Sequence, residues 1–418
     1  MNQNKLTLIF ILVMCLMLAS PKLMFSQMNM GQYEDEAPLQ SWNTFGLQTA
    51  PSLGRGGAGF TLSVDSSCSL LNPALLTRLP KLSVTISGAY NAASMFRYAI
   101  LNTGVFTTTQ NQSFGIYSGD YIGLSAKIKG WSLSLSVSNL ESFRRPELVW
   151  NYTYEGQLYY TIHFDQTGLM LNTNFSLAKK ISDRLSAGLG LNFVRAKQER
   201  LIEEQWIVSN RSITDSRTLR LNGFYLNGGI VWDFSDKMTL AAVFRTPYAR
   251  KGDSESLYRF QASQGNTDIQ IDGEGESSFL QPTVFGIGMH YDIFEDLLFT
   301  ADASFFNWSS YEVELFGEAL QRDFKNIVKI NAGFELISEF TLFNLKINSP
   351  FRFGFIYDPQ PMKTPDSYYM GFALGSGIYF RNFIVDFAYF TGKENGSGHK
   401  LAVKKILFTI SFQMGRTE

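Results

Sequence analysis

From Lys81 onward, apolar and polar side chains alternate along much of the chain. The clearest case lies between Trp131 and Ser138, where every second residue is serine and the residues between are tryptophan, leucine, leucine and valine. Successive side chains of a β-strand point to opposite faces, so this pattern produces one apolar and one polar face. A closed barrel turns such apolar faces outward to lipid and the polar faces inward to its lumen. We therefore predict an all-β fold, a transmembrane antiparallel β-barrel.

The alternating pattern recurs often enough to predict about fourteen strands, an even number as expected for a bacterial barrel. Where the pattern is clear, a segment of roughly ten residues is long enough to cross a bilayer at a tilt. The predicted strands are Leu82–Tyr90, Ile122–Ile128, Trp131–Ser138, Leu169–Leu177, Leu185–Phe193, Phe224–Trp232, Met238–Phe244, Phe285–Tyr291, Leu297–Phe305, Val328–Leu336, Phe351–Tyr357, Phe372–Phe380, Phe383–Tyr389 and Ile406–Phe412.

The predicted connections alternate between short turns and long loops. The short ones lie near Lys129, Ser182, Asp236, Glu295 and Arg381-Asn382. The long ones span residues 91–113, 141–166, 198–218, 247–280, 309–325 and 391–400. Ser338–Pro350 is an exception, because it is a longer connection where a short turn is due. Short turns on one side and long loops on the other are typical of outer-membrane barrels.

The composition and the N-terminus agree with an exported membrane protein. Charged residues are only 17% of the chain, yet outside the N-terminal leader no apolar run is long enough for a membrane-spanning helix. The net charge of −1 argues against a nucleic-acid partner. Met1–Ser26 combines Lys5 with an apolar stretch and is a predicted signal peptide. Its removal would leave Cys68 as a single cysteine, and the 3 histidines are scattered, so we expect no disulfide, metal or cofactor.

The stretch Ser52–Leu79, here called the hatch segment, fits no strand pattern. Its first part is rich in glycine, which permits positive φ angles and a close approach to a neighbouring wall. Turn-forming residues follow, and then a short apolar piece of helical character. The candidate residues of this segment are Gly54, Gly57, Gly59, Asp65, Asn72, Pro73 and Ala74. We predict that the segment forms a compact plug.

The hatch segment resembles the N-terminal hatch of the long-chain fatty-acid transporter (FadL-type) family of outer-membrane proteins. That family commonly combines a glycine- and alanine-rich run with a polar turn and the motif N-P-A-G-L. Here the motif reads Asn72-Pro73-Ala74, with Leu75 in place of the glycine. The resemblance implies a hatch inside the barrel lumen and passive uptake of hydrophobic small molecules, such as fatty acids, through a barrel surrounded by outer-membrane lipid. It also implies gating by movement of the hatch.

These predictions divide the chain into a signal peptide (1–26), an extension and hatch (27–80), a barrel (81–413) and a tail (414–418). Turning the apolar face outward places several ionisable residues in the lumen, where an unpaired charge is costly. We predict that five of them hold the hatch; for each one, a generic hydrated lumen is the alternative. They are Arg245, Asp302, Glu335, Arg352 and Asp386. The sequence does not single out ligand-binding residues.

Catalysis is not expected. The chain has no G-x-S-x-G motif, His163 and His399 fall in predicted loops, and His290 is a predicted lumen residue. Two other functions remain open. A FadL-like barrel could serve as a partner-binding or secretion-assembly component, and a general polar porin could form a barrel of the same size. A porin should show a charged constriction and no plug.

Overall fold

The computed structural model describes residues 49–62, 64–94, 106–109, 113–143, 145–262, 267–321, 323–342, 345–364, 366–396 and 402–415. The predicted signal peptide, most of the predicted extension and the last three residues of the tail lie outside these ranges. Among the described residues, no helix is long and apolar enough to cross a membrane.

Of the strands in these ranges, fourteen pair with two neighbours each and close into one antiparallel ring, which β20 completes by pairing with β1. In order around the ring they are β1 (Leu82–Ser94), β3 (Ser113–Ile128), β4 (Trp131–Ser142), β6 (Gln157–Lys180), β7 (Leu185–Trp206), β8 (Arg211–Ser235), β9 (Met238–Arg245), β12 (Val284–Asp292), β13 (Leu297–Phe306), β16 (Ile327–Leu342), β17 (Leu345–Pro359), β18 (Tyr368–Phe380), β19 (Phe383–Asn395) and β20 (Ala402–Met414). The predicted barrel is confirmed, and each predicted strand lies within one of these.

The two faces of the ring follow the predicted alternation. Leu135 on β4 is 56% exposed, whereas its neighbours Ser134 and Ser136 are each 2% exposed. The same contrast recurs around the ring, where large apolar side chains cover the outside and serines, threonines and asparagines line the inside. An apolar exterior of this kind has a lower free energy in the hydrocarbon of a bilayer than in water. The barrel is therefore a transmembrane one.

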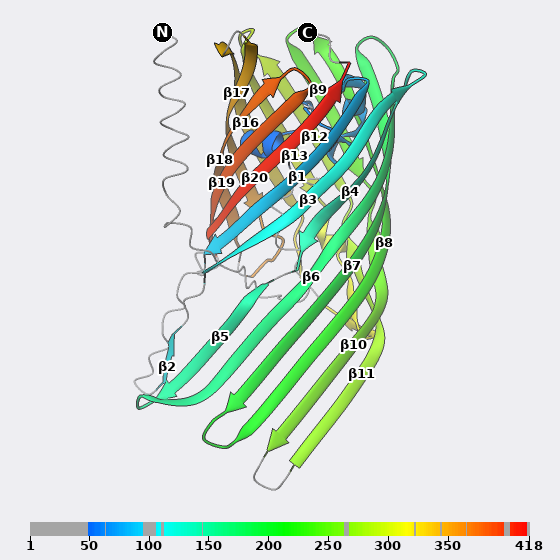
Figure 1. Ribbon diagram of the computed structural model, residues 1–418. Coiled ribbons are helices and arrows are strands. Elements are labelled where there is room, and N and C mark those ends of the chain that lie inside the picture. Colours follow the sequence, from blue (N-terminus) through cyan, green and yellow to red (C-terminus); the bar gives the residue numbers. More distant parts are fainter. Residues whose placement is uncertain are drawn as a thin grey trace.

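The two ends of the barrel differ. At one end, called here the short-turn end, adjacent strands are joined by a few residues, such as Lys129-Gly130 between β3 and β4. At the other, called the extended end, β6, β7 and β8 continue well past their neighbours, and further strands extend the sheet on both sides of them (Figure 1). These additional strands are β2 (Phe106–Thr109), β5 (Arg145–Tyr154), β10 (Tyr248–Ala262), β11 (Thr267–Gln281), β14 (Val313–Leu315) and β15 (Glu318–Leu320), with the short 3-10 helix η4 (Trp308–Ser310) before β14.

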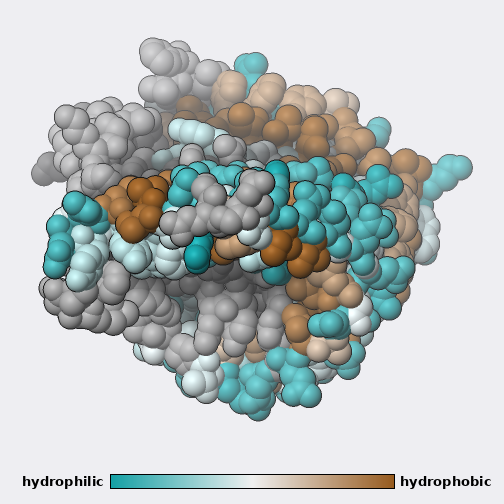
Figure 2. Space-filling view, turned by 90° about the horizontal axis from the view of Figure 1, so that it is seen from below, coloured by the Kyte–Doolittle hydropathy of each residue, from teal (hydrophilic) through white to brown (hydrophobic). Residues whose placement is uncertain are grey.

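The prediction of long irregular loops is wrong in several places. Residues 198–218 continue the β7–β8 ladder as far as the pair Trp206 and Arg211, and the described residues of the range 247–280 form the paired strands β10 and β11. The described residues of the exception at Ser338–Pro350 are also strand, paired as far as Leu342 and Leu345. Beyond the bilayer both faces of a strand can meet water, so the apolar alternation fades while the backbone ladder continues. Figure 2 views this end, whose rim is largely hydrophilic with hydrophobic patches between.

Candidate functional site

The hatch segment lies inside the barrel, in the half nearer the short turns (Figure 1). It contains α2 (Ala50–Gly54), α3 (Cys68–Leu71) and the 3-10 helix η3 (Pro73–Arg78). α2 begins at Thr49, whose N–H donates to Ser52 Oγ at 3.2 Å. η3 begins after Asn72, whose side chain accepts from the Ala74 N–H at 3.1 Å. These polar caps satisfy backbone groups that a short helix leaves free at its start.

Glycines let the hatch segment lie directly against the barrel wall. A Cβ added to Gly354 on β17 would stand 1.9 Å from the Gly56 nitrogen, and one added to Gly333 on β16 would stand 2.5 Å from the Arg55 carbonyl oxygen. Gly54 meets Gly375 on β18, where a Cβ on either residue would come within about 3 Å of the other backbone. We name Gly333, Gly354 and Gly375 the glycine notch. The sequence analysis identified the hatch glycine Gly54 but not the notch that receives it.

The other predicted hatch residues occupy definite places. Gly57 has a φ of 83°, a conformation that favours glycine, and a Cβ on Gly59 would lie 2.9 Å from Leu71 Cδ1 within the hatch segment. On the opposite wall, a Cβ on Gly188 of β7 would come within 2.5 Å of the Ala74 nitrogen and the Pro73 carbonyl carbon. The segment is therefore in tight contact with two sides of the lumen.

Three of the predicted lumen charges meet in one ion-pair network with the hatch. Glu335 on β16 accepts from Arg55 Nη1 and from Arg352 Nε, both at 2.6 Å. Arg352 on β17 also donates from Nη1 to Asp386 at 2.7 Å and from Nη2 to the Tyr379 hydroxyl at 2.6 Å. The network is buried and holds two cations and two carboxylates, so its charges balance. Arg55, which joins the hatch to the wall, was missed by the sequence analysis.

The remaining two predicted lumen residues lie elsewhere. Asp302 on β13 accepts from the backbone N–H groups of Gly59 and Phe60, at 2.7 and 3.0 Å. Arg245 at the end of β9 lies instead over the ring of Tyr225, 5.8 Å from its centroid. Asp302 and Glu335 thus bond to the hatch directly, and Arg352 and Asp386 are linked to it through Glu335. Arg245 lies against the barrel's own side chains.

Polar side chains of the hatch segment and of the opposite wall also join the two. Asn72 Nδ2 donates to the Phe60 carbonyl at 2.8 Å and to the Ile230 carbonyl on β8 at 3.3 Å. Asn227 on β8 donates to the Ser69 carbonyl at 2.9 Å, and Arg78 pairs with Asp233 at 2.5 Å. These contacts account for backbone groups that would otherwise be unpaired in the lumen.

Asp65 is bonded within the hatch segment. It accepts from the N–H and hydroxyl of Ser67, at 2.8 and 2.5 Å, and from the Thr49 hydroxyl at 3.0 Å. Burial raises the pKa of this carboxyl, and the hydrogen bonds from Ser67 and Thr49 oppose that rise. The residue therefore fixes the turn between the two halves of the hatch.

Asp302 offers a test of these contacts. We expect Asp302→Ala to leave the Gly59 and Phe60 N–H groups without their acceptor, at a cost of about 1–3 kcal/mol for each buried donor. Asp302→Asn keeps an oxygen at this place and should lose less. Hydrogen–deuterium exchange of the peptide that contains Gly59 and Phe60 measures the effect; exchange as slow in the alanine variant as in the wild type would contradict it.

Between the hatch and the extended end lies a cluster of aromatic and other apolar side chains. Trp308 lies 5.7 Å from Tyr311 and 6.2 Å from Phe324 between ring centroids. These rings belong to one buried apolar cluster that continues to Phe60 and Leu71 of the hatch. Its other large members are Phe143, Met170, Tyr225, Tyr248, Phe279, Phe306 and Met362. The sequence analysis placed Trp308 and Tyr311 next to or inside a predicted loop and identified no ligand pocket.

A closed transmembrane barrel whose N-terminal segment folds into its own lumen defines a plugged β-barrel. No protein-family model matches the chain, and no curated protein matches it in sequence. Several solved structures are similar to it in fold. The CymD monoaromatic hydrocarbon channel has a TM-score of 0.61 at 16% identity, over 90% of this chain and 99% of that one. A Pseudomonas aeruginosa FadL homologue has a TM-score of 0.61 at 14% identity, over 89% and 99%.

The Ralstonia pickettii toluene transporter TbuX is similar as well, with a TM-score of 0.58 at 14% identity, over 90% of this chain and 100% of that one. These likenesses cover almost the whole of each chain. The resemblance to FadL-type proteins drawn from the hatch motif is thus confirmed at the level of the fold.

Proposed function

We propose that this protein is an outer-membrane channel for the passive uptake of hydrophobic compounds, gated by the hatch segment. The observation that carries the proposal is the buried apolar cluster, which continues from Trp308 near the extended end to Phe60 of the hatch. An apolar solute gains free energy when it leaves water for such a lining. A general porin needs the opposite, a hydrated polar channel.

The proposed arrangement places the short turns in the periplasm and the extended end outside the cell. The predicted division into signal peptide, extension and hatch, barrel and tail belongs to this proposal. Similar structures are described as a channel for monoaromatic hydrocarbons and as a toluene transporter, which supports small aromatic hydrocarbons as candidate solutes. Fatty acids are candidates through the resemblance of the hatch motif to the FadL-type family. Movement of the hatch away from the glycine notch and from Asp302 would open the path to the periplasm.

Uptake by whole cells tests the proposal. The gene is expressed in a Gram-negative host that lacks its own FadL-type channel, and entry of labelled toluene and of a labelled fatty acid is measured. We expect faster entry of at least one of them than with an empty vector, and no change on adding an uncoupler. Equal rates with and without the protein, for both solutes, would refute the channel.

A single substitution locates the path. Trp308→Gln puts a polar amide in the apolar cluster, and we expect uptake to fall about tenfold, since burying a large ring contributes roughly 2–3 kcal/mol. The matched control is Trp232→Gln, which changes a tryptophan on the lipid-facing side of β8 that is 44% exposed. Equal uptake by the two variants would place the path elsewhere.

A partner-binding role is the second candidate, and the extended end favours it. Tyr258, Ile269 and Ile271 are all more than a third exposed on β10 and β11. Their face of the sheet continues to Tyr160, which stacks on Tyr152 at 4.1 Å and on Trp206 at 4.6 Å. An exposed apolar sheet face of this kind is typical of surfaces that bind another protein. A stoichiometric protein that co-purifies in mild detergent would support this role.

A further inference from the structure

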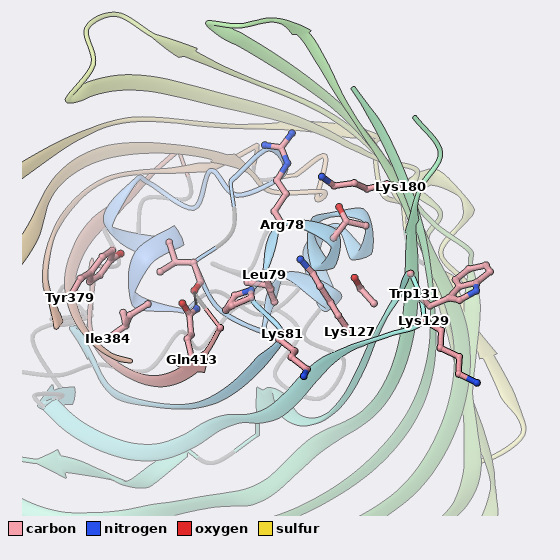
Figure 3. Close-up of a pocket in the computed structure, with 16 residues that line it drawn as sticks. Arg78, Leu79, Lys81, Lys127, Lys129, Trp131, Lys180, Tyr379, Ile384 and Gln413 are labelled. Atoms are coloured by element: carbon pink, nitrogen blue, oxygen red, sulfur yellow. Dashed lines mark hydrogen bonds between the residues drawn. The ribbon is translucent and has the colours of Figure 1, made fainter. Parts of the chain in front are cut away.

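The short-turn end of the barrel contains a hollow of about 880 Å³. The end of the hatch segment forms one side of it, the β3–β4 turn and the end of β6 a second, and β18, β19 and the end of β20 the third. In Figure 3, Arg78, Lys127 and Lys180 extend into this hollow from different elements, whereas Lys129 and Trp131 point away from it. Three cationic side chains therefore converge on one space.

The lining is strongly basic. It includes the side chains of Arg78, Lys81, Lys127 and Lys180, whereas Lys129 borders the hollow with its side chain turned outward. Among the described residues no aspartate or glutamate lines it. Arg78 is neutralised by Asp233 beyond the lining, but the 4 lysines have no ion-pair partner within the described part of the chain. Lys127 and Lys180 extend into the same hollow, so their like charges repel each other. No described residue of the lining carries a negative charge that would compensate this repulsion, and an anion between the two lysines would compensate it.

The same hollow has an apolar side. Leu79 and Ile384 are buried at 3% and 2% exposure, and they line it together with Val64 and Pro80. A free phosphate or chloride ion would make no use of these side chains. A solute with an apolar body and one anionic group would place its body on this side and its charge at Lys127 and Lys180.

We propose that this hollow is a binding site for amphipathic organic anions, which carry a carboxylate, sulfonate or phosphate on an apolar body. The inference rests on the proposed function in one respect, because it makes the hollow the last binding site on the path by which solutes leave the channel for the periplasm. The basic site would then favour the exit of hydrophobic acids over that of neutral hydrocarbons. It also raises the local concentration of such anions on the periplasmic side.

Two probes that differ only in charge test the proposal. Naphthalene-2-sulfonate and naphthalene are equilibrated with the purified full chain in a non-ionic detergent, and micelles without protein serve as the blank. We expect saturable binding of the sulfonate that weakens several-fold when ionic strength rises from about 0.05 M to about 0.5 M. In Lys127→Gln/Lys180→Gln the affinity should fall at least about tenfold, and naphthalene binding should stay unchanged.

Lys129→Gln is the matched control, because Lys129 lies in the adjacent turn and points out of the hollow. It should keep the wild-type affinity for the sulfonate. Heat-dependent gel migration confirms that each variant is folded; if the double variant is not, Lys127→Gln and Lys180→Gln are measured singly, each with an expected loss of about threefold.

The possible failures are distinguishable. A wild type without salt-sensitive sulfonate binding, or an equal loss in Lys129→Gln, overturns the anion site. Neither result affects the uptake of toluene or of a fatty acid, on which the proposed function depends. Conversely, a protein that binds the sulfonate at Lys127 and Lys180 but takes up no hydrophobic solute would keep the anion site and lose the channel.

Discussion

Replacing Arg352 by methionine should release the hatch segment while leaving the barrel closed. Arg352 is fully buried and pairs with Glu335 and Asp386 at once. Without it, two buried carboxylates share the single cation of Arg55, and breaking a buried pair in this way costs about 3–5 kcal/mol. The ring has its own continuous ladder of strand pairs, so most of this cost should fall on the hatch. Trypsin reports the result, because Arg55 is 1% exposed in the intact protein and becomes a cleavage site once the hatch moves.

Two further variants separate the ion pairs from general damage. Arg381→Met removes an arginine from the β18–β19 turn, where it lies over Phe380, and should leave Arg55 protected. In Arg352→Met/Asp386→Leu one uncompensated carboxylate is removed together with the arginine, so part of the protection should return. If trypsin fails to cut Arg352→Met at Arg55, the network does not hold the hatch in place.

The barrel could be predicted from the sequence because lipid acts on every second side chain. From Trp131 to Ser138 of β4 the serines point inward and the apolar residues outward, so the residue pattern alone fixes both the strand and the direction of its faces. At the extended end this constraint disappears. Arg211–Thr218 has no apolar alternation, and its strand is evident only from the partner residues on β7 and β10. The pattern of apolar and polar residues depends on whether each face of a strand meets lipid or water. It does not depend on which residues the strand pairs with through hydrogen bonds.

The charged residues that join the hatch to the barrel wall could be predicted from the sequence. Glu335, Arg352 and Asp386 stand out because an ionisable residue at an inward position of an alternating strand needs a partner. Arg55 has no such pattern around it, and only the folded hatch brings it to Glu335. The glycine notch was hidden for another reason: glycine belongs to neither the apolar nor the polar set. Register places Gly333 opposite Gly354, and a sequence read one strand at a time does not contain that register.

Gly354→Ala should displace the hatch as well, through packing in place of charge. The new Cβ would lie 1.9 Å from the Gly56 nitrogen; the backbone of β17 fixes the position of the Cβ, and the nitrogen is itself a backbone atom, so no side-chain rotation relieves the clash. Overpacking of this kind costs about 1–3 kcal/mol, which the barrel avoids if the hatch shifts from the notch.

Cys68 provides the measurement, since it is 4% exposed in the hatch and the other cysteine, Cys15, lies in the predicted signal peptide. A maleimide should label Gly354→Ala faster than the wild type, and Gly119→Ala, where a Cβ meets nothing within 4 Å, no faster. Equal labelling of all three proteins would mean that the notch tolerates a side chain and that the ion pairs alone hold the hatch.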